Sequence, residues 1–398
     1  MVARSPLGWE PIPARPRRAW RLVFGGVAAV VLAIIVLNAI PVSYYALAPG
    51  DALAVNGPNG AVTVRSAHTG SGRLFLTTVA LQSHVSLWDR LLGTSLHPNL
   101  TLVPKRAITN GASPTQFQAQ THQEMTGSQL AAKVAALRRL GYPVPEDGDG
   151  ALVIEVGSGT PAAGQLRPGD IIKKVDGRPV KVAANARALI RAHRPGDTVS
   201  FEVSRPAAAD AVPGALGASA QPARGAASGS TAGMVGRDVR TVACGSGCPG
   251  DEQRPLIGVA LATDAQSFKL PPDVGLNIET DNIGGPSAGL AFTLGAIDSL
   301  TSHNLTGGHR VAVTGTIDAD GTVGPVGGVQ QKTVAVENAH CDYFLVPADE
   351  FNDAQRKARG HSLKVVKVNS LDDALTFLGT IGGSLGGIPA RSGGAHVG

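Results

Sequence analysis

The sequence predicts a multi-domain chain with an N-terminal transmembrane helix, a mostly-β module in the middle and an α/β (α+β) module at the C-terminal end. Three observations lead to this fold class. An apolar run begins at Leu22, short strands bounded by turn residues fill 141–206, and helices alternate with strands after about Arg254. With 398 residues, the chain is long enough for two or three domains, each with its own core.

The apolar run from Leu22 to Ile40 predicts the transmembrane helix. Only Asn38 interrupts it, and its 19 residues can cross a hydrocarbon core of roughly 30 Å. Arginines crowd residues 1–21, which predicts that this end is cytoplasmic and that the later domains lie outside the cell membrane. A cleaved signal peptide is the alternative, because Ala46-Leu47-Ala48 has the small-x-small pattern of a cleavage site.

The composition excludes some classes of partner and cofactor. The formal net charge is +5, and no basic patch interleaved with aromatic residues appears beyond the N-terminus, which argues against nucleic acid. No His-Glu-x-x-His motif and no zinc-like spacing of His and Cys occurs, so neither a metal nor another cofactor is predicted. Cys244 and Cys248 either form a small-loop disulfide in an oxidising compartment or remain two thiols.

Residues 41–125 form a region that is rich in predicted strands but carries no recognisable chemistry. Apolar and polar residues alternate in its strand-like segments, which are 61–64, 74–79 and 100–103. Helical spacing then predicts a helix over 128–140 that stops at Gly141.

The region 126–243 is predicted to be a small β-rich domain. Its elements are strands over 151–156 and 198–203, a helix over 183–192, a hairpin turn at Asp176-Gly177, a returning strand over 235–242 and a disordered insert over 207–233. With Pro168-Gly169-Asp170-Ile171-Ile172, this order resembles the PDZ domains of bacterial envelope proteases.

The PDZ resemblance implies that an extended peptide adds to a sheet edge beside the last helix. The peptide-binding residues would then be Leu189 on that helix, with Gly141 and Tyr142 offering backbone N–H groups to a terminal carboxylate. A packing module with no ligand is the alternative.

Residues 250–381 are predicted to form the α/β domain, and residues 382–398 a disordered tail. A strand over 274–278 leads into a helix whose buried stripe includes Leu290 and Leu294. The following predicted elements are strands over 311–313, 322–326, 343–346 and 363–368, and helices around Lys332 and over 353–359 and 371–378.

Residues 285–289 (Gly-Pro-Ser-Ala-Gly) fit the G-x-S-x-G pattern of a nucleophile elbow. That interpretation needs a later acid and histidine, for which Asp342 or Asp349 with His361 are the candidates. About 110 residues follow the serine, and no His-Gly-Gly motif precedes it, so the sequence disfavours this triad.

A serine–lysine site explains more of the sequence. The hydroxyl of Ser287 needs a base, and a lysine becomes one when an apolar pocket disfavours its charged form. The residues around Lys332 are apolar or uncharged from Gly321 through Val336. Gly285 and Pro286 would shape the nucleophile turn, where backbone N–H groups at the helix start face a developing oxyanion.

These motifs resemble the Lon-type proteolytic domain, a Ser–Lys peptidase, over residues 254–380. The match continues through Thr314-Gly315 and Gly327-Gly328 to Lys332 and Ala335. The resemblance implies Ser287 as nucleophile, Lys332 as general base and Thr314 as the hydroxyl that orients the lysine. Thr316 and the segment 282–284 depart from acidic residues that are common in the family, which bears on substrate preference.

Together, the anchor, the PDZ-like module and the Lon-like domain resemble bacterial membrane-anchored, ATP-independent PDZ–Lon proteases of the YlbL type. The chain has no Gly-Lys pair, so no Walker A motif for ATP is present. The resemblance implies a serine endopeptidase for unfolded or membrane-proximal polypeptides, and a homo-oligomer, namely a hexamer. A non-enzymatic PDZ adaptor with a vestigial Lon-like scaffold is the alternative.

Overall fold

The computed structural model describes residues 17–57, 60–64, 73–93, 95, 97–205, 233–244, 253–272, 274–280, 283–301 and 304–389. The predicted disordered insert lies outside these residues, apart from Gly233, and so does the predicted tail beyond residue 389. Cys244 is disulfide-bonded, whereas Cys248 lies outside the described residues. Cys341 is buried and free.

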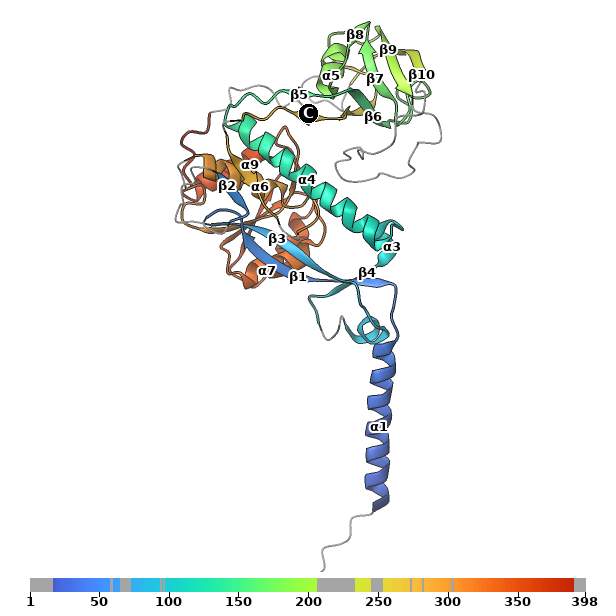
Figure 1. Ribbon diagram of the computed structural model, residues 1–398, viewed down its shortest axis with the longest axis vertical. Helices are drawn as coiled ribbons and strands as arrows, with labels where there is room; N and C mark the ends of the chain where they lie inside the picture. The colour runs from blue at the N-terminus through green and yellow to red at the C-terminus, as the bar shows by residue number, and fades with distance from the viewer. Residues whose placement is uncertain are drawn as a thin grey trace, which may run out of the picture.

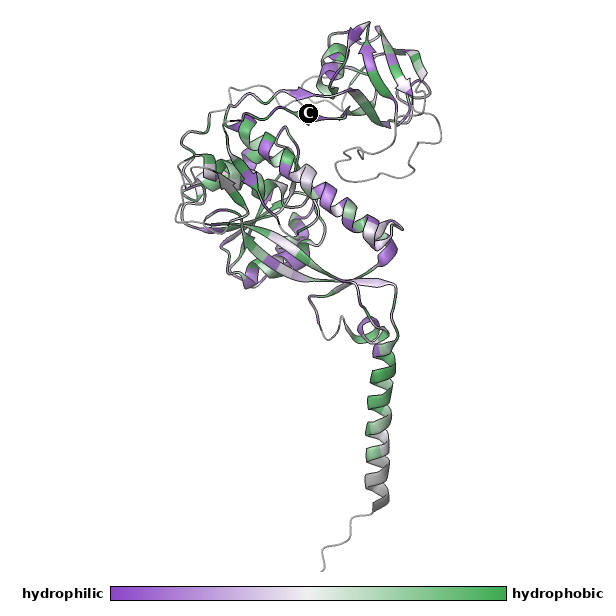
Figure 2. Ribbon diagram, in the orientation of Figure 1, coloured by the Kyte–Doolittle hydropathy of each residue, from purple (hydrophilic) through white to green (hydrophobic). Residues whose placement is uncertain are grey.

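Helix α1 (Arg17–Ala39) covers most of the predicted transmembrane segment and projects from the rest of the chain (Figure 1). Its side chains, described from Phe24 on, are mostly apolar and largely exposed (Figure 2). Within the described part of the chain, no helix has the length and the apolar content to span a membrane, so the predicted transmembrane helix is not found there.

A six-stranded sheet joins the two ends of the described chain. Its strands lie in the order β20-β19-β16-β3-β1-β4, with parallel pairing from β3 through β20 and antiparallel pairing of β1 with β3 and β4. The segments predicted separately as 41–125 and 250–381 therefore share one sheet. The strands are β1 (Tyr44–Ala54), β3 (Arg73–Gln82), β4 (Thr101–Pro104), β16 (Arg310–Val313), β19 (Tyr343–Pro347) and β20 (Lys364–Val368).

A buried polar contact fastens the N-terminal strands to helix α6 (Gly289–Leu300). The Asn56 side chain donates to Asp298 Oδ2 over 2.7 Å and accepts the Leu74 N–H over 2.9 Å. The Asp298 carboxylate also accepts the Leu305 N–H, and burial raises the pKa of Asp298. Buried polar groups need hydrogen-bond partners, and a shift of the chain around Asn56 relative to α6 would leave Asn56 and Asp298 without theirs. The hydrogen bond therefore fixes the register of the chain around Asn56 against α6.

Helix α4 (Pro114–Arg139) is twice as long as the predicted helix over 128–140. It starts with Pro114 in the first turn and Ser113 as N-cap, in a capping box with Gln116. Its first half is rich in polar residues and lacks an apolar stripe, so hydrophobic spacing alone does not reveal it. Figure 1 shows α4 crossing the larger sheet region, with its C-terminal end toward the smaller domain.

A second sheet holds the predicted small domain, in the order β10-β9-β7-β6-β13, with β8 paired to β7. Helix α5 (Ala183–Arg191) packs on it, and Phe201 and Ile172 are buried in its core. Strand β13 comes from beyond the predicted boundary at residue 243. The strands are β6 (Gly150–Val156), β7 (Ile171–Val175), β8 (Arg178–Pro179), β9 (Thr198–Arg205), β10 (Gly233–Arg240) and β13 (Val259–Asp264).

The remaining described elements are short pairs and covering helices. The antiparallel pairs are β2 (Val62–Val64) with β15 (Leu276–Ile278), β5 (Glu146–Asp147) with β14 (Ser267–Phe268), β11 (Val242–Ala243) with β12 (Pro255–Leu256), and β17 (Thr316–Ile317) with β18 (Val323–Gly324). The helices are η1 (Asp89–Gly93), α3 (Lys105–Thr109), α7 (Val329–Asn338), α8 (Phe351–Lys357) and α9 (Leu371–Thr380).

Candidate active site

The nucleophile turn lies between β15 and α6. Ser287 is partly exposed, and α6 starts two residues after it, so Pro286 stands in the turn just before the helix. The Ser287 carbonyl accepts the Gly315 N–H over 3.0 Å and the Thr314 hydroxyl over 3.3 Å. The end of β16 therefore holds the serine backbone. Asp281 and Asn282 lie outside the described residues.

Lys332 stands in the first turn of α7, where its N–H donates to the Gly328 carbonyl over 3.0 Å. Gly328 is the N-cap at φ 68°, and a Cβ there would lie 2.8 Å from Val79 Cγ2 of β3. Both the left-handed backbone and the close strand require glycine at this position. The Gly327-Gly328 pair of the motif thus lets α7 begin against the sheet.

The Lys332 side chain is buried, with 2% of its surface exposed. Its amine donates to Thr314 Oγ1 over 2.9 Å. Burial lowers the pKa of Lys332 from 10.5 to about 7, against the opposing effect of the nearby Glu350 charge. Loss of hydration disfavours the ammonium form. A substantial fraction of the amine is therefore neutral, and able to act as a base, near neutral pH.

Thr314 links the two predicted catalytic residues. Its side chain is fully buried, and its N–H donates to the Leu345 carbonyl over 3.0 Å, which fixes it at the end of β16. Its hydroxyl accepts from Lys332 and donates to the Ser287 carbonyl. Among the described residues, no hydrogen bond joins the Ser287 hydroxyl directly to the Lys332 amine.

The candidate backbone donors for an oxyanion are the N–H groups that follow Pro286. The Gly285 N–H donates to the Thr121 carbonyl over 3.0 Å, and Pro286 has no N–H. The N–H groups of Ser287 and Ala288 have no hydrogen-bond partner within the described part of the chain. Gly285, at φ 87°, and Pro286 therefore shape the turn, and the next two residues are the candidate donors.

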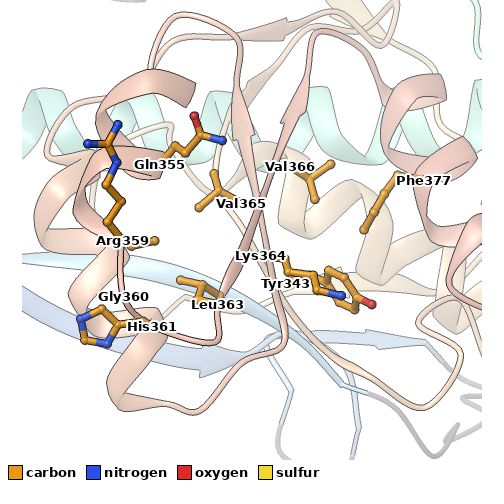
Figure 3. A pocket seen from close by; sticks show the side chains of 11 residues that line it. Tyr343, Gln355, Arg359, Gly360, His361, Leu363, Lys364, Val365, Val366 and Phe377 are labelled. Atoms are coloured by element: carbon orange, nitrogen blue, oxygen red, sulfur yellow. The ribbon is translucent and has the colours of Figure 1, made fainter.

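The alternative triad is not assembled. The His361 side chain is 56% exposed, and its Nδ1 lies 3.8 Å from Glu337 Oε2. It lines a cavity of about 550 Å³ beside β20, together with Tyr343 and Phe377 (Figure 3). Asp342 instead accepts the Arg310 N–H and faces His309. In the described structure, none of these groups bonds to Ser287.

The predicted peptide-binding residues separate into two places. Leu189 of α5 packs in the same cluster as Val259 and Leu261 of β13. Strand β13 is the last strand of its described sheet, and Thr263 ties its far end to α5 by accepting the Ala183 N–H.

Gly141 and Tyr142 lie instead at the C-terminal end of α4. The Tyr142 N–H donates to the Leu137 carbonyl, and a Cβ on Gly141 would face Pro389. The structure thus brings Leu189 to an open sheet edge, whereas Gly141 and Tyr142 lie elsewhere. Strand β13 is not among the predicted elements, and the period-two spacing of Val259 and Leu261 is the sequence signal that could have indicated it.

Among the described side chains, no group of three or more His, Cys, Asp or Glu residues is arranged to hold a metal ion.

The buried amine predicts a pH-dependent stability. Lys332 has a lower pKa in the folded chain than the 10.5 of an unfolded one, so the unfolded state binds more protons between about pH 7 and 10.5. Lys332→Met should therefore be more stable than wild type at pH 7, by on the order of 4 kcal/mol. The difference should shrink as the pH rises to 10.5, as measured by urea unfolding. A difference independent of pH would contradict the lowered pKa.

Two family models match this chain. Residues 138–212 match the PDZ domain, and residues 280–378 match the Lon protease (S16) C-terminal proteolytic domain. Lon protease 1 of Sorangium cellulosum is 34% identical over 94 residues, and the Lon protease of Chloroflexus aggregans is 33% identical over 93 residues. Each match covers 23% of this chain and 11% of the relative, so the chain spans about a tenth of those proteins.

Among solved structures, the PDZ domain of an SdrC-like protein from Listeria monocytogenes is 22% identical, with a TM-score of 0.20. That alignment covers 28% of this chain and 87% of the other. By the two family models, a segment that matches the PDZ domain is followed in this chain by a segment that matches the Lon protease C-terminal proteolytic domain.

Proposed function

We propose that this chain is an ATP-independent serine endopeptidase in which Ser287 is the nucleophile and Lys332 the general base. The observation that carries the proposal is the buried Lys332 amine, bonded to a threonine hydroxyl that also holds the Ser287 carbonyl. Burying a lysine amine away from water lowers the stability of the fold. In a serine–lysine site, the same burial allows the amine to act as the general base for the serine. The similarity to Lon proteolytic domains agrees with this assignment.

In the proposed reaction, Ser287 Oγ attacks the scissile carbonyl while its proton passes to the Lys332 amine. The amine already donates one hydrogen to Thr314, which leaves its lone pair to receive that proton. The N–H groups of Ser287 and Ala288 stabilise the oxyanion. Lys332 then protonates the leaving amine, and water, activated by the same lysine, hydrolyses the acyl-enzyme.

The proposed substrates are unfolded or membrane-proximal polypeptides. The chain carries no Walker A motif to power unfolding, so the extended segment must already be accessible. We place the enzyme at the cell membrane through α1, since the apolar run 22–40 follows several arginines and the helix exposes apolar side chains. Recovery of the full chain in the soluble fraction without detergent would contradict this placement.

We assign the PDZ domain the recruitment of a peptide to the open edge of β13 beside α5. The free strand edge offers backbone hydrogen bonds, and Leu189, Val259 and Leu261 offer an apolar surface. An adaptor without catalysis would use the same edge but would have no use for a buried Lys332.

Substitution of the dyad tests catalysis. Ser287→Ala should reduce casein cleavage by the full chain to background, and Lys332→Ala should lower kcat/KM about 100- to 10,000-fold because the base is lost. Thr314→Val, which keeps the shape but removes both hydrogen bonds, should lower kcat by about tenfold or more. Lys357→Ala removes a half-buried lysine of α8 whose amine donates to Asn99, and as the matched control it should cleave normally. Wild-type cleavage by Ser287→Ala would refute the proposal.

Peptide binding is tested in the Ser287→Ala background, where the ligand stays intact. A fluorescent peptide with an apolar, free C-terminus should bind the full chain, and Leu189→Arg should weaken it about tenfold or more. Tyr142→Ala, which changes an exposed residue away from β13, should bind like the parent. Equal weakening by both variants, or by neither, would contradict the β13 site.

A further inference from the structure

The turn that carries Ser287 is hydrogen-bonded to helix α4, which precedes it by about 150 residues. The Gly285 N–H donates to the Thr121 carbonyl, and Ser128 Oγ donates to the Pro286 carbonyl, each over 3.0 Å. Gln129 Nε2 donates to Thr280 Oγ1 over 2.9 Å. About two turns of α4 therefore form hydrogen bonds to three residues of the segment that leads to Ser287.

The Ser128 contact is the one closest to the chemistry. In a trans peptide, the carbonyl and the following N–H point in opposite directions. Ser128 holds the Pro286 carbonyl toward α4, so the Ser287 N–H of the same peptide points away from α4. In the described chain, this N–H has no hydrogen-bond partner. The same Pro286 carbonyl accepts the Gly289 N–H over 3.3 Å, which closes the turn.

Ser128 lies in tightly packed surroundings that hold its hydroxyl against the serine turn. Ser128 is 6% exposed on a helix face whose neighbours Met125, Ala132 and Ala135 belong to the main apolar core. A Cβ on Gly289 would lie 2.9 Å from Ser128 Oγ, so the last glycine of Gly-Pro-Ser-Ala-Gly is what admits the hydroxyl. A polar residue at a buried apolar position costs stability unless it is bonded.

We propose that Ser128 is a positioning residue of the active site, which aims the Ser287 N–H at the oxyanion by holding the Pro286 carbonyl. It touches neither substrate nor the reacting atoms. Since an oxyanion develops only in the transition state, loss of this contact affects kcat and leaves KM unchanged. The inference rests on the proposed peptidase function and adds a residue from outside the matched proteolytic domain.

The test compares Ser128→Ala with Thr126→Ala, an exposed hydroxyl on the same helix that bonds only its own backbone. Active sites are titrated with a fluorophosphonate so that kcat refers to folded enzyme. Ser128→Ala should lower kcat for a fluorogenic peptide about tenfold or more, with unchanged KM, while Thr126→Ala matches wild type. Affinity for a peptide boronate, which forms a tetrahedral adduct on the serine, should fall by a similar factor.

Two results would overturn the proposal: a kcat for Ser128→Ala within about twofold of Thr126→Ala, or a rise in KM alone. Failure of the peptidase function itself gives a different result, because wild type and Ser287→Ala would then behave alike.

Discussion

The burial of one lysine amine is the constraint on which the rest of the proteolytic domain depends. Removing an ammonium group from water is costly, so burial lowers the pKa of Lys332 to about 7, while the amine keeps one hydrogen bond, to Thr314. Thr314 is held in turn by Leu345 on the neighbouring parallel strand. The register of β16 against β19 therefore determines the position of the Lys332 amine. The same end of β16 also holds the Ser287 backbone.

The segment before the PDZ domain builds the other wall of this site. Val329 and Val336 of α7 pack against Phe75 of β3, and Gly328 lies against Val79 of that strand. Gln331 donates to Thr101 of β4 over 2.7 Å. The lysine helix is thus enclosed by strands from the beginning of the chain, and these strands are needed for its dehydration.

The local sequence pattern predicts individual helices and strands well, but it does not predict which distant strands pair with each other. The Gly-Pro-Ser-Ala-Gly turn and the helices around Lys332 and over 371–378 can be predicted because short-range spacing and capping determine them. The sheet that merges 41–125 with 250–381, and the transfer of β13 to the PDZ sheet, depend on pairing between distant strands, which periodicity does not encode. Likewise, the contact of Ser128 with Pro286 and the candidate donor N–H groups of Ser287 and Ala288 can be identified only in the structure, where α4 lies against the serine turn.

The protonation of Lys332 can be measured directly, without substrate. In full-length protein labelled with ¹³C-lysine, the Lys332 side-chain signals can be assigned by their loss in Lys332→Met and followed through a pH titration. A midpoint near 7, far below those of the exposed lysines, is the expected result for an amine buried beside Thr314. A midpoint near 10.5 would mean that the amine stays charged at neutral pH, and would contradict its role as the base.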